Sequence, residues 1–148
     1  MTDRCAYCAL AGEDAAEPFG GWIHRDEQWL VAPGEPATTM PGALRITSRR
    51  HYVDFADMAA AEAATFGPLC SVLDRALRAT TDTECVHLVS TRDRIAHFHA
   101  WLYPRPAAHP LRGTEFLNAP QRGTPDIVES TARALRTHLS EYLLGSTH

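Results

Sequence analysis

The sequence predicts an α+β domain in which a five-stranded antiparallel sheet carries one long inserted helix and a C-terminal helix. Short apolar segments with alternating polar residues recur between turn-rich stretches, as expected for strands joined by hairpins and loops. One long segment in the middle of the chain and another at its end place apolar residues every three or four positions instead, as helices do. A chain of 148 residues without an internal repeat fits one domain, residues 1–148, large enough to bury a core.

Turn residues mark the first three strands. Residues 22–25 and 28–32 flank an Asp-Glu turn, which predicts a hairpin. Prolines and a glycine make residues 33–41 a loop, because these residues break regular structure. Residues 42–48 alternate like a half-buried strand, so His51 falls just beyond a strand end.

The middle of the chain combines the long helix with two further strands. Asp57 is a suitable N-cap for a helix whose apolar residues keep helical spacing to about Ala79. Residues 86–90 and 95–103 then predict two strands joined by the charged turn Arg92-Asp93-Arg94.

The last third of the chain begins irregularly and closes on a helix. Proline and glycine predict an irregular stretch over residues 107–123. Thr124, Pro125 and Asp126 supply an N-cap, a proline at the first helical position and an early acid. The predicted apolar face of this helix consists of Ile127, Thr131, Leu135, Leu139 and Tyr142.

Composition excludes several classes of protein. A formal net charge of −4 argues against a protein that grips duplex nucleic acid, which needs a dense basic surface. The first residues lack an apolar core followed by a cleavage site, and no later stretch approaches the ~20 apolar residues of a membrane span. We therefore expect a soluble, cytoplasmic protein with no membrane partner. In that compartment a Cys-x-x-Cys motif such as Cys5 to Cys8 is typical of a metal or redox site.

The segment from His97 to Arg105 reads His-Phe-His-Ala-Trp-Leu-Tyr-Pro-Arg and is the strongest functional signal. In an extended strand, His97 and His99 point to the same side, about two residue rises (~6.6 Å) apart. This arrangement suits a metal ligand beside a nucleophile, or two catalytic groups around one phosphorus. The alternative is a strand with two hydrogen-bonded histidines and no function.

Taken with Cys5-Ala6-Tyr7-Cys8 and Ser48-Arg49-Arg50-His51, this segment resembles the histidine-triad superfamily of nucleotidyl hydrolases and transferases. The family motif alternates three histidines with apolar residues and often ends in Pro-Arg. Aligned on Pro104-Arg105, His97 and His99 take the first two histidine positions, and Trp101 stands in place of the third. The resemblance implies a histidine-triad-like α+β fold, a nucleotide substrate and a homodimer.

The resemblance also implies a zinc site. The Cys-x-x-Cys spacing lets two thiolates of one turn reach the same tetrahedral ion. Zinc-containing members of the superfamily complete the site with histidines at the positions of His51 and His97, which gives Cys5, Cys8, His51 and His97 as ligands of Zn²⁺. Four protein ligands leave no open position, so the ion would be structural. The alternative is a reduced cysteine pair packed under the first hairpin and a surface histidine.

In the family, the histidine at the position of His99 attacks the α-phosphate and forms a nucleotidyl-histidine intermediate, which passes to water or to another acceptor. Trp101 cannot replace the third histidine as an acid or base at neutral pH. The galactose-1-phosphate uridylyltransferase branch, with glutamine at that position, transfers in place of hydrolysing. Trp101 therefore favours an acceptor other than water, or it only packs at the edge of a pocket or dimer.

Four further residues are predicted to bind substrate. Glu35 lies sixteen residues before His51, where the family often has an aspartate that holds the ribose hydroxyls, and a carboxylate accepts both protons. Arg94 takes the place of a phosphate-binding serine and offers a charge-assisted donor. Trp101 and Arg105 are the other two.

The resulting prediction is a nucleotidyl hydrolase or nucleotidyltransferase with His99 as nucleophile. The alternative is a zinc-stabilised nucleotide-binding module that has lost catalysis together with the third histidine. Both imply a small-molecule nucleotide as ligand and no stable nucleic-acid partner. A third hypothesis, a zinc-bearing nucleic-acid binder, requires salt-sensitive affinity and is disfavoured by the acidic composition.

Overall fold

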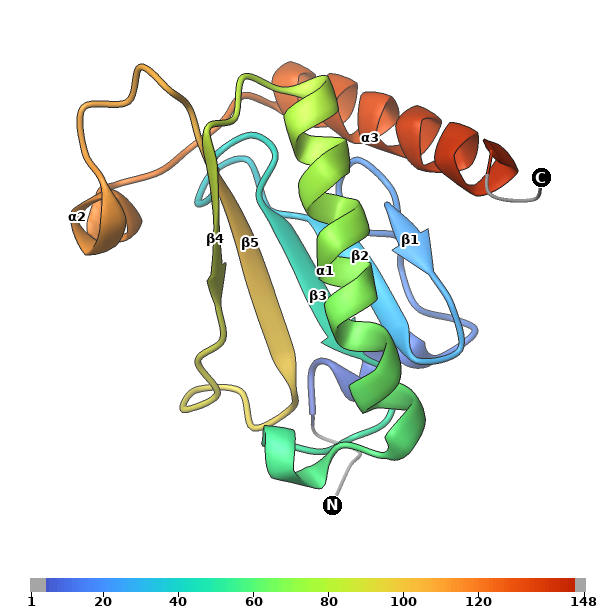
Figure 1. The fold of residues 1–148 in the computed structure, drawn as a ribbon. Coiled ribbons are helices and arrows are strands. Elements are labelled where there is room, and N and C mark those ends of the chain that lie inside the picture. Colours follow the sequence, from blue (N-terminus) through green and yellow to red (C-terminus); the bar gives the residue numbers. More distant parts are fainter. Residues whose placement is uncertain (1–4, 146–148) are drawn as a thin grey trace.

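The computed structural model describes residues 5–145, and within this range five strands form one sheet in the order β1-β2-β3-β5-β4 (Figure 1). Every neighbouring pair of strands is antiparallel. The sheet and its helices confirm the predicted α+β architecture. The strands are β1 (His24–Arg25), β2 (Trp29–Pro33), β3 (Leu44–Ser48), β4 (Cys85–Val89) and β5 (His99–Arg105).

Helices cover one face of this sheet. The long helix α1 (Ala60–Thr80) crosses the face that is turned toward the viewer in Figure 1, and α3 (Pro125–Gly145) packs against α1 near the upper end of the strands. The short helix α2 (Gly113–Asn118) lies apart from them, beyond β4. Two 3-10 turns, η2 (Cys8–Ala11) and η3 (Phe55–Asp57), complete the described elements. In residues 5–145, no helix has the length and apolar character needed to cross a membrane.

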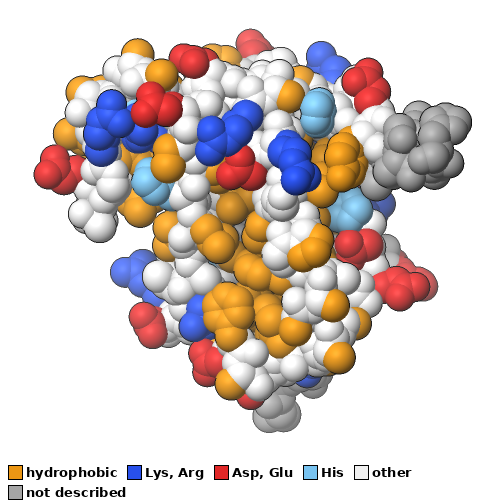
Figure 2. Space-filling model, in the orientation of Figure 1, with side chains coloured by type: hydrophobic (Ala, Val, Ile, Leu, Met, Phe, Trp, Pro, Cys, Tyr) orange, Lys and Arg blue, Asp and Glu red, His pale blue; other side chains and the backbone are white. Residues whose placement is uncertain are grey.

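The core lies between the sheet and the two long helices. Ala100 and Leu102 of β5 are buried there with Leu73 and Leu77 of α1. At the lower end of this layer Phe98 is completely buried, and its ring lies among four other aromatic rings that belong to Trp29, Tyr52, Phe55 and Phe66. On the face that carries α1, hydrophobic side chains gather in the central and lower part, and charged side chains gather toward the top (Figure 2).

Two expectations for the segments that carry α1 and α2 were wrong. Helix α1 begins at Ala60, and its start is held by Glu62 of the first turn, whose side chain accepts a hydrogen bond from the N–H of the N-cap residue Ala59 at 2.7 Å. Asp57 ends the preceding turn η3 instead of capping α1. The stretch 107–123 is not wholly irregular, because α2 forms within it around the buried Phe116. Propensity was overridden there by the burial of one aromatic side chain.

The strand predicted over residues 95–103 begins only at His99, so His97 precedes it. The buried face of α3 is also shifted from the predicted one, since Ile127 and Tyr142 are exposed. The apolar residues that α3 does bury are Val128, Ala132, Leu135 and Leu139. The N-cap prediction for α3 is supported by the Ile127 N–H, which lies 3.4 Å from the Thr124 hydroxyl.

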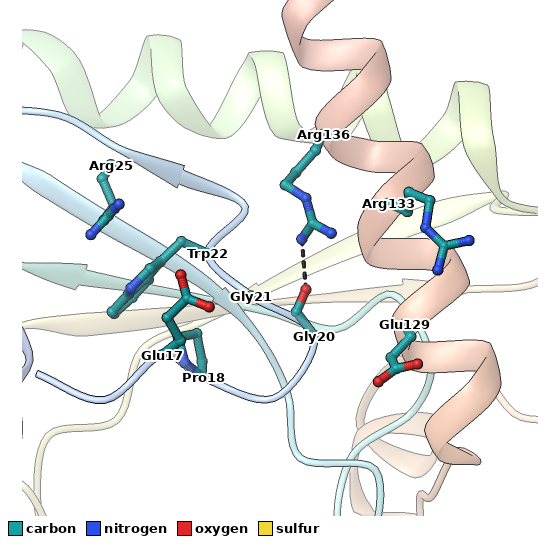
Figure 3. A pocket seen from close by; sticks show the side chains of 9 residues that line it. All are labelled: Glu17, Pro18, Gly20, Gly21, Trp22, Arg25, Glu129, Arg133 and Arg136. Atoms are coloured by element: carbon teal, nitrogen blue, oxygen red, sulfur yellow. Dashed lines mark hydrogen bonds between the residues drawn. The ribbon is translucent and has the colours of Figure 1, made fainter.

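The loop before β1 is fastened to α3. Gly20 and Gly21 both have φ near +82°, and the Arg136 guanidinium packs on Gly21 and donates to the Gly20 carbonyl at 2.6 Å. A Cβ on Gly21 would stand 3.3 Å from Arg136 Nη1, so a side chain here would disturb this contact as well as the backbone. A cavity of about 650 Å³ lies at this junction, with the Arg133 and Trp22 side chains on its two sides (Figure 3).

Candidate metal centre and histidine site

Four ligand atoms of the predicted metal site converge at one end of the sheet. Among the described residues, Cys5, Cys8, His51 and His97 bring one sulfur or nitrogen each to within 4.8 Å of one another. The cysteines come from the N-terminal turn, His51 from the segment after β3, and His97 from the residues just before β5. The fold therefore gathers three distant segments at one point.

Four of the six separations among these atoms are close to those around a tetrahedral ion. With Zn–S near 2.3 Å and Zn–N near 2.0–2.1 Å, tetrahedral geometry requires S···N separations of about 3.6 Å and an N···N separation of about 3.3 Å. The His97 Nδ1 atom lies 3.4 Å from the Cys5 sulfur and 3.6 Å from the Cys8 sulfur. The Cys8 sulfur lies 3.2 Å from His51 Nδ1, and the two Nδ1 atoms are 3.2 Å apart. These four side chains can hold a metal ion.

His97 is oriented for this role by its other ring nitrogen. Its Nε2 lies 2.7 Å from the Ser48 carbonyl oxygen, so Nε2 carries the proton and Nδ1 keeps a lone pair for the ion. The side chain is fully buried, which fixes the ring further. A carbonyl that orients a ligating imidazole in this way is the usual partner of a metal-bound histidine.

His99 presents the opposite arrangement. Its Nδ1 lies 2.7 Å from the His97 carbonyl oxygen, so Nδ1 donates and Nε2 keeps the free lone pair. The Ser90 hydroxyl donates to the His99 carbonyl at 2.6 Å and ties this residue to the loop before β5. A neutral imidazole with a fixed tautomer and a free Nε2 is a competent nucleophile.

Tyr7, between the two cysteines, packs against both histidines. Its ring meets His99 edge-on at a centroid distance of 4.9 Å and His97 at 6.0 Å. The two histidines therefore lie on the same side, as the sequence pattern predicts, although His97 lies outside the strand. The Arg45 guanidinium stands 4.8 Å from the centre of the Tyr7 ring. Tyr7 thus joins the metal centre to the surroundings of His99.

Arg45 belongs to β3, and its place is set by the register with β5. Arg45 pairs with Trp101 and Thr47 pairs with His99, so these side chains share the face of the sheet turned away from α1. Among the described residues, the buried Arg45 Nε has no hydrogen-bond partner. A positive charge with an unused donor therefore stands beside the position that the third histidine would occupy.

Arg92 is the second cation whose charge acts on His99, although its guanidinium packs over the Phe55 and Phe98 rings. Its Nη1 donates to the Ser90 hydroxyl at 2.7 Å and to the Ser90 carbonyl at 3.1 Å, and its Nε lies 3.3 Å from an Asp54 carboxylate oxygen. Burial, followed by the charges of Arg45 and Arg92, holds the pKa of His99 below its usual range, against the opposing hydrogen bond to the His97 carbonyl. His99 is therefore neutral at pH 7.

The other predicted binding residues are not gathered at His99. Arg94 is exposed on the loop before β5, and Arg105 is buried at the far end of β5 with its guanidinium 3.1 Å from Glu84. Glu35 is exposed beyond the end of β2. Trp101 lies on the His99 face of β5 and stacks on Tyr103.

Sequence reasoning missed Tyr7, Arg45 and Arg92 as neighbours of His99. For Arg45 a signal existed, because an arginine at a polar position of an alternating strand lies on the face of its cross-strand partner once the register is known. Tyr7 could have been linked to the site through the two cysteines that flank it. No local pattern distinguishes Arg92 from Arg94. The path of the loop before β5 decides which of the two side chains is exposed and which is bonded to Ser90 and Asp54.

Solved structures provide the comparison, because no family model and no curated protein matches the sequence. A Zn-bound histidine triad family protein from Mycobacterium smegmatis superposes with a TM-score of 0.75 at 21% identity, over 98% of this chain and 99% of that one. A hypothetical histidine triad nucleotide-binding protein from Sulfolobus tokodaii gives 0.71 at 12% identity, over 93% of both chains.

This chain has the histidine-triad fold. A uridylyltransferase shares the fold with a TM-score of 0.64 at 17% identity, and the match spans 93% of this chain but 45% of that longer one. Within the histidine-triad fold, the cluster that can hold a metal ion and the free imidazole of His99 occupy one end of the sheet.

Proposed function

We propose that this protein is a nucleotidyl hydrolase or nucleotidyltransferase that acts at the α-phosphate through a covalent intermediate on His99. The observation that carries the proposal is the fixed tautomer of His99, whose Nε2 is free while Nδ1 is held by the His97 carbonyl. The names of the histidine triad nucleotide-binding neighbour and of the uridylyltransferase support nucleotide chemistry in general.

A structural zinc ion at Cys5, Cys8, His51 and His97 is part of the proposal. The tetrahedral separations and the Zn-bound neighbour of the same fold support the choice of metal. Bound zinc would supply a rigid cross-link and would leave no position for substrate, since four protein ligands fill it. Through the His97 carbonyl, the metal centre positions the His99 ring.

The reaction has two displacements at phosphorus. His99 Nε2 attacks the α-phosphorus, and the bond to the leaving group breaks with its electron pair going to that group, which takes a proton from solvent. An acceptor oxygen or nitrogen then attacks the same phosphorus, the N–P bond breaks, and the acceptor loses its proton to solvent. Arg45, whose buried Nε has no partner among the described residues, donates to the phosphoryl oxygens and stabilises the negative charge that builds on them.

Access to His99 is narrow. The residue is 7% exposed, and Tyr7 covers one edge of its ring. The phosphoryl group therefore enters beside Tyr7, on the side where Arg45 lies. Trp101, at the third motif position, offers one indole N–H and no acid or base, so the acceptor in the second step can be water or another nucleophile.

We retain Glu35 and Trp101 as substrate-binding residues, and we replace Arg94 and Arg105 by Arg45, which lies on the His99 face of the sheet. We also infer a homodimer. The strand β4 lies at an edge of the sheet, where an unpaired strand can add a second copy, and its Leu88 side chain is 52% exposed. Light scattering on the purified chain tests the dimer, and a monomer at micromolar concentration would contradict it.

The test of the reaction compares wild type, His99→Ala and a control variant, His138→Ala on α3, with a panel of dinucleoside polyphosphates, nucleotide sugars, adenylyl sulfate and nucleoside phosphoramidates. Mass spectrometry follows the release of nucleoside monophosphate, transfer to added amine or phosphate acceptors, and the mass of the intact protein. We expect wild type and the control, but not His99→Ala, to turn over a donor and to carry a nucleotidyl adduct.

The alternative function is a zinc-stabilised nucleotide-binding module without catalysis, and Trp101 in place of an acid–base group is the observation that favours it. No turnover by wild type, with nucleotide affinity that His99→Ala leaves unchanged, would establish this alternative. Turnover that survives in His99→Ala would also refute the covalent step.

A further inference from the structure

The cavity of about 650 Å³ between the loop before β1 and helix α3 carries charges of both signs and one indole ring (Figure 3). Its volume is in the range of small-molecule sites. The indole belongs to Trp22, and the charged side chains that line the cavity are Glu17, Arg25, Glu129, Arg133 and Arg136. We propose that this cavity binds an α-amino acid with an apolar side chain, in its zwitterionic form, at a site separate from His99.

The cavity is separate from the metal cluster and from the histidine site. None of its lining residues belongs to the cluster that can hold a metal ion. Arg25 lies in the same row of the sheet as His99, but three strand spacings away, which is about 14 Å. The ligand of this cavity is therefore recognised by groups that take no part in the proposed reaction.

The Arg136 guanidinium is fixed in the cavity as a fork for a carboxylate. Its Nη1 donates to the Gly20 carbonyl at 2.6 Å, and the same atom lies 3.3 Å from the place where a Cβ on Gly21 would stand. Within the described chain this is the one hydrogen bond of a side chain that has five N–H groups. Arg133 lies one turn earlier on α3 and also lines the cavity. A planar carboxylate accepts two parallel N–H bonds from such a guanidinium.

The loop side of the cavity brings a carboxylate and an aromatic ring together. The Gly21 N–H donates to the Pro18 carbonyl at 2.9 Å, so the chain reverses there, and Glu17 and Trp22 directly flank the two ends of this turn (Figure 3). The Glu17 carboxylate accepts the ammonium group of the ligand. The Arg25 guanidinium already stands 5.7 Å from the centre of the Trp22 ring, so this ring packs against the uncharged side chain of the ligand.

The unpaired charges around the cavity favour a zwitterion over a simple ion. Among the described residues, no ion pair joins Glu17 or Glu129 to any of the lining arginines, although Glu129 and Arg133 are four positions apart on α3. A phosphate or another simple anion would pair with the arginines but would face two carboxylates, and a simple cation would face the arginines. An α-amino acid carries one charge of each sign and pairs with both sets.

Calorimetric titration of the full-length protein with L-phenylalanine, L-leucine and L-tryptophan tests the site. The amino acid that binds most tightly is then compared with the matched acid that lacks the amino group and with the matched amine that lacks the carboxylate; for phenylalanine these are 3-phenylpropionate and 2-phenylethylamine. Glu17→Gln and Arg133→Met remove one charge of each sign at exposed positions of the cavity. The controls Glu13→Gln and Arg75→Met make the same changes at exposed positions that do not line it, and circular dichroism checks folding.

We expect each cavity variant to raise the Kd of the amino acid about fivefold, because exposed charges contribute moderately, while both controls stay within about twofold of wild type. The matched acid and amine should each bind about fivefold more weakly than the amino acid or worse. Either fragment binding as tightly as the amino acid would overturn the zwitterion, and so would the lack of saturable binding of all three amino acids below about 10 mM.

Two further titrations test whether the site is separate. The variant His99→Ala should bind the amino acid with unchanged affinity, and AMP should not displace it. Displacement by AMP, or loss of amino acid binding in His99→Ala, would place the ligand at the histidine site and overturn the inference. Failure of nucleotide turnover by wild type would overturn the proposed function alone.

Discussion

Glu62→Gln isolates one ion pair that holds the segment carrying His51. The Glu62 carboxylate is buried and accepts from the Arg50 guanidinium at 2.6 Å and from the Ala59 N–H at 2.7 Å. Arg50 also donates to the Asp57 carbonyl, so Glu62 fixes the start of α1 against the residue before His51. Glutamine keeps the shape of the side chain but removes its charge and turns an NH₂ group toward one of the two donors.

The expected loss follows from the exposure of the two partners. Hydrogen bonds to charged groups contribute about 1.5–3 kcal/mol, and a cap of the first turn of a helix about 1 kcal/mol. The Arg50 side chain is 47% exposed, so water replaces part of its lost partner and lowers the total. We therefore expect Glu62→Gln to reduce the free energy of unfolding by about 2 kcal/mol at pH 7, or the Tm by about 4–8 °C.

The difference in free energy of unfolding between wild type and Glu62→Gln depends on pH in one direction only. Burial alone would raise the pKa of Glu62, but the hydrogen bonds from Arg50 and the Ala59 N–H outweigh it and hold the pKa below 4.5, the ordinary value. A carboxylate with a lowered folded-state pKa stabilises the protein above that ordinary value and loses this contribution as the pH falls through its folded pKa. The gap between wild type and Glu62→Gln should therefore narrow below pH 4.5.

Urea denaturation at several pH values between 3 and 8 measures this gap, with the exposed Glu141→Gln of α3 as the matched control. A variant within about 0.5 kcal/mol of wild type at pH 7 would refute the assigned role of the ion pair. A gap that widens on acidification would refute the sign of the pKa shift.

Three further outcomes are expected. Cys8→Ser should reduce zinc, measured by plasma mass spectrometry, from about one ion per chain to near zero, whereas Cys70→Ser should retain it; equal zinc in both would exclude the proposed ligand set. Arg45→Met should raise the Kd of AMP about tenfold in calorimetry without changing that of adenosine, and a parallel loss for both ligands would contradict a phosphate contact. Phe98→Ala should cost about 3–5 kcal/mol of unfolding free energy; a loss below 1 kcal/mol would show that the ring is not needed for the core.

The sequence predicted those features that depend on local pattern. The strands, the long helix and the helix after Thr124 follow from alternation, helical spacing and capping, and all are present. The metal cluster was also predicted: the spacing of Cys5 and Cys8 indicated a metal site, and the resemblance to the histidine-triad superfamily supplied His51 and His97. These signals survive in a single sequence since each involves residues that are close along the chain.

Features that depend on register or on single buried side chains were not predicted. Arg45 reaches Tyr7 because β3 pairs with β5 in one particular register, and neither strand encodes that register alone. Helix α2 forms where one aromatic residue, Phe116, finds a buried site against the sheet. The late start of β5 has a similar cause, because His97 leaves the strand to place its Nδ1 beside the cysteines.

The position of the metal centre has a consequence for the order in which the chain assembles. Cys5 and His97 are separated by 92 positions, so bringing them together closes well over half of the chain into a loop. Closing so long a loop costs entropy that local contacts cannot repay. We therefore expect the N-terminal turn to be placed last in the assembly of this domain, after β3 and β5 have paired and set His51 and His97 side by side.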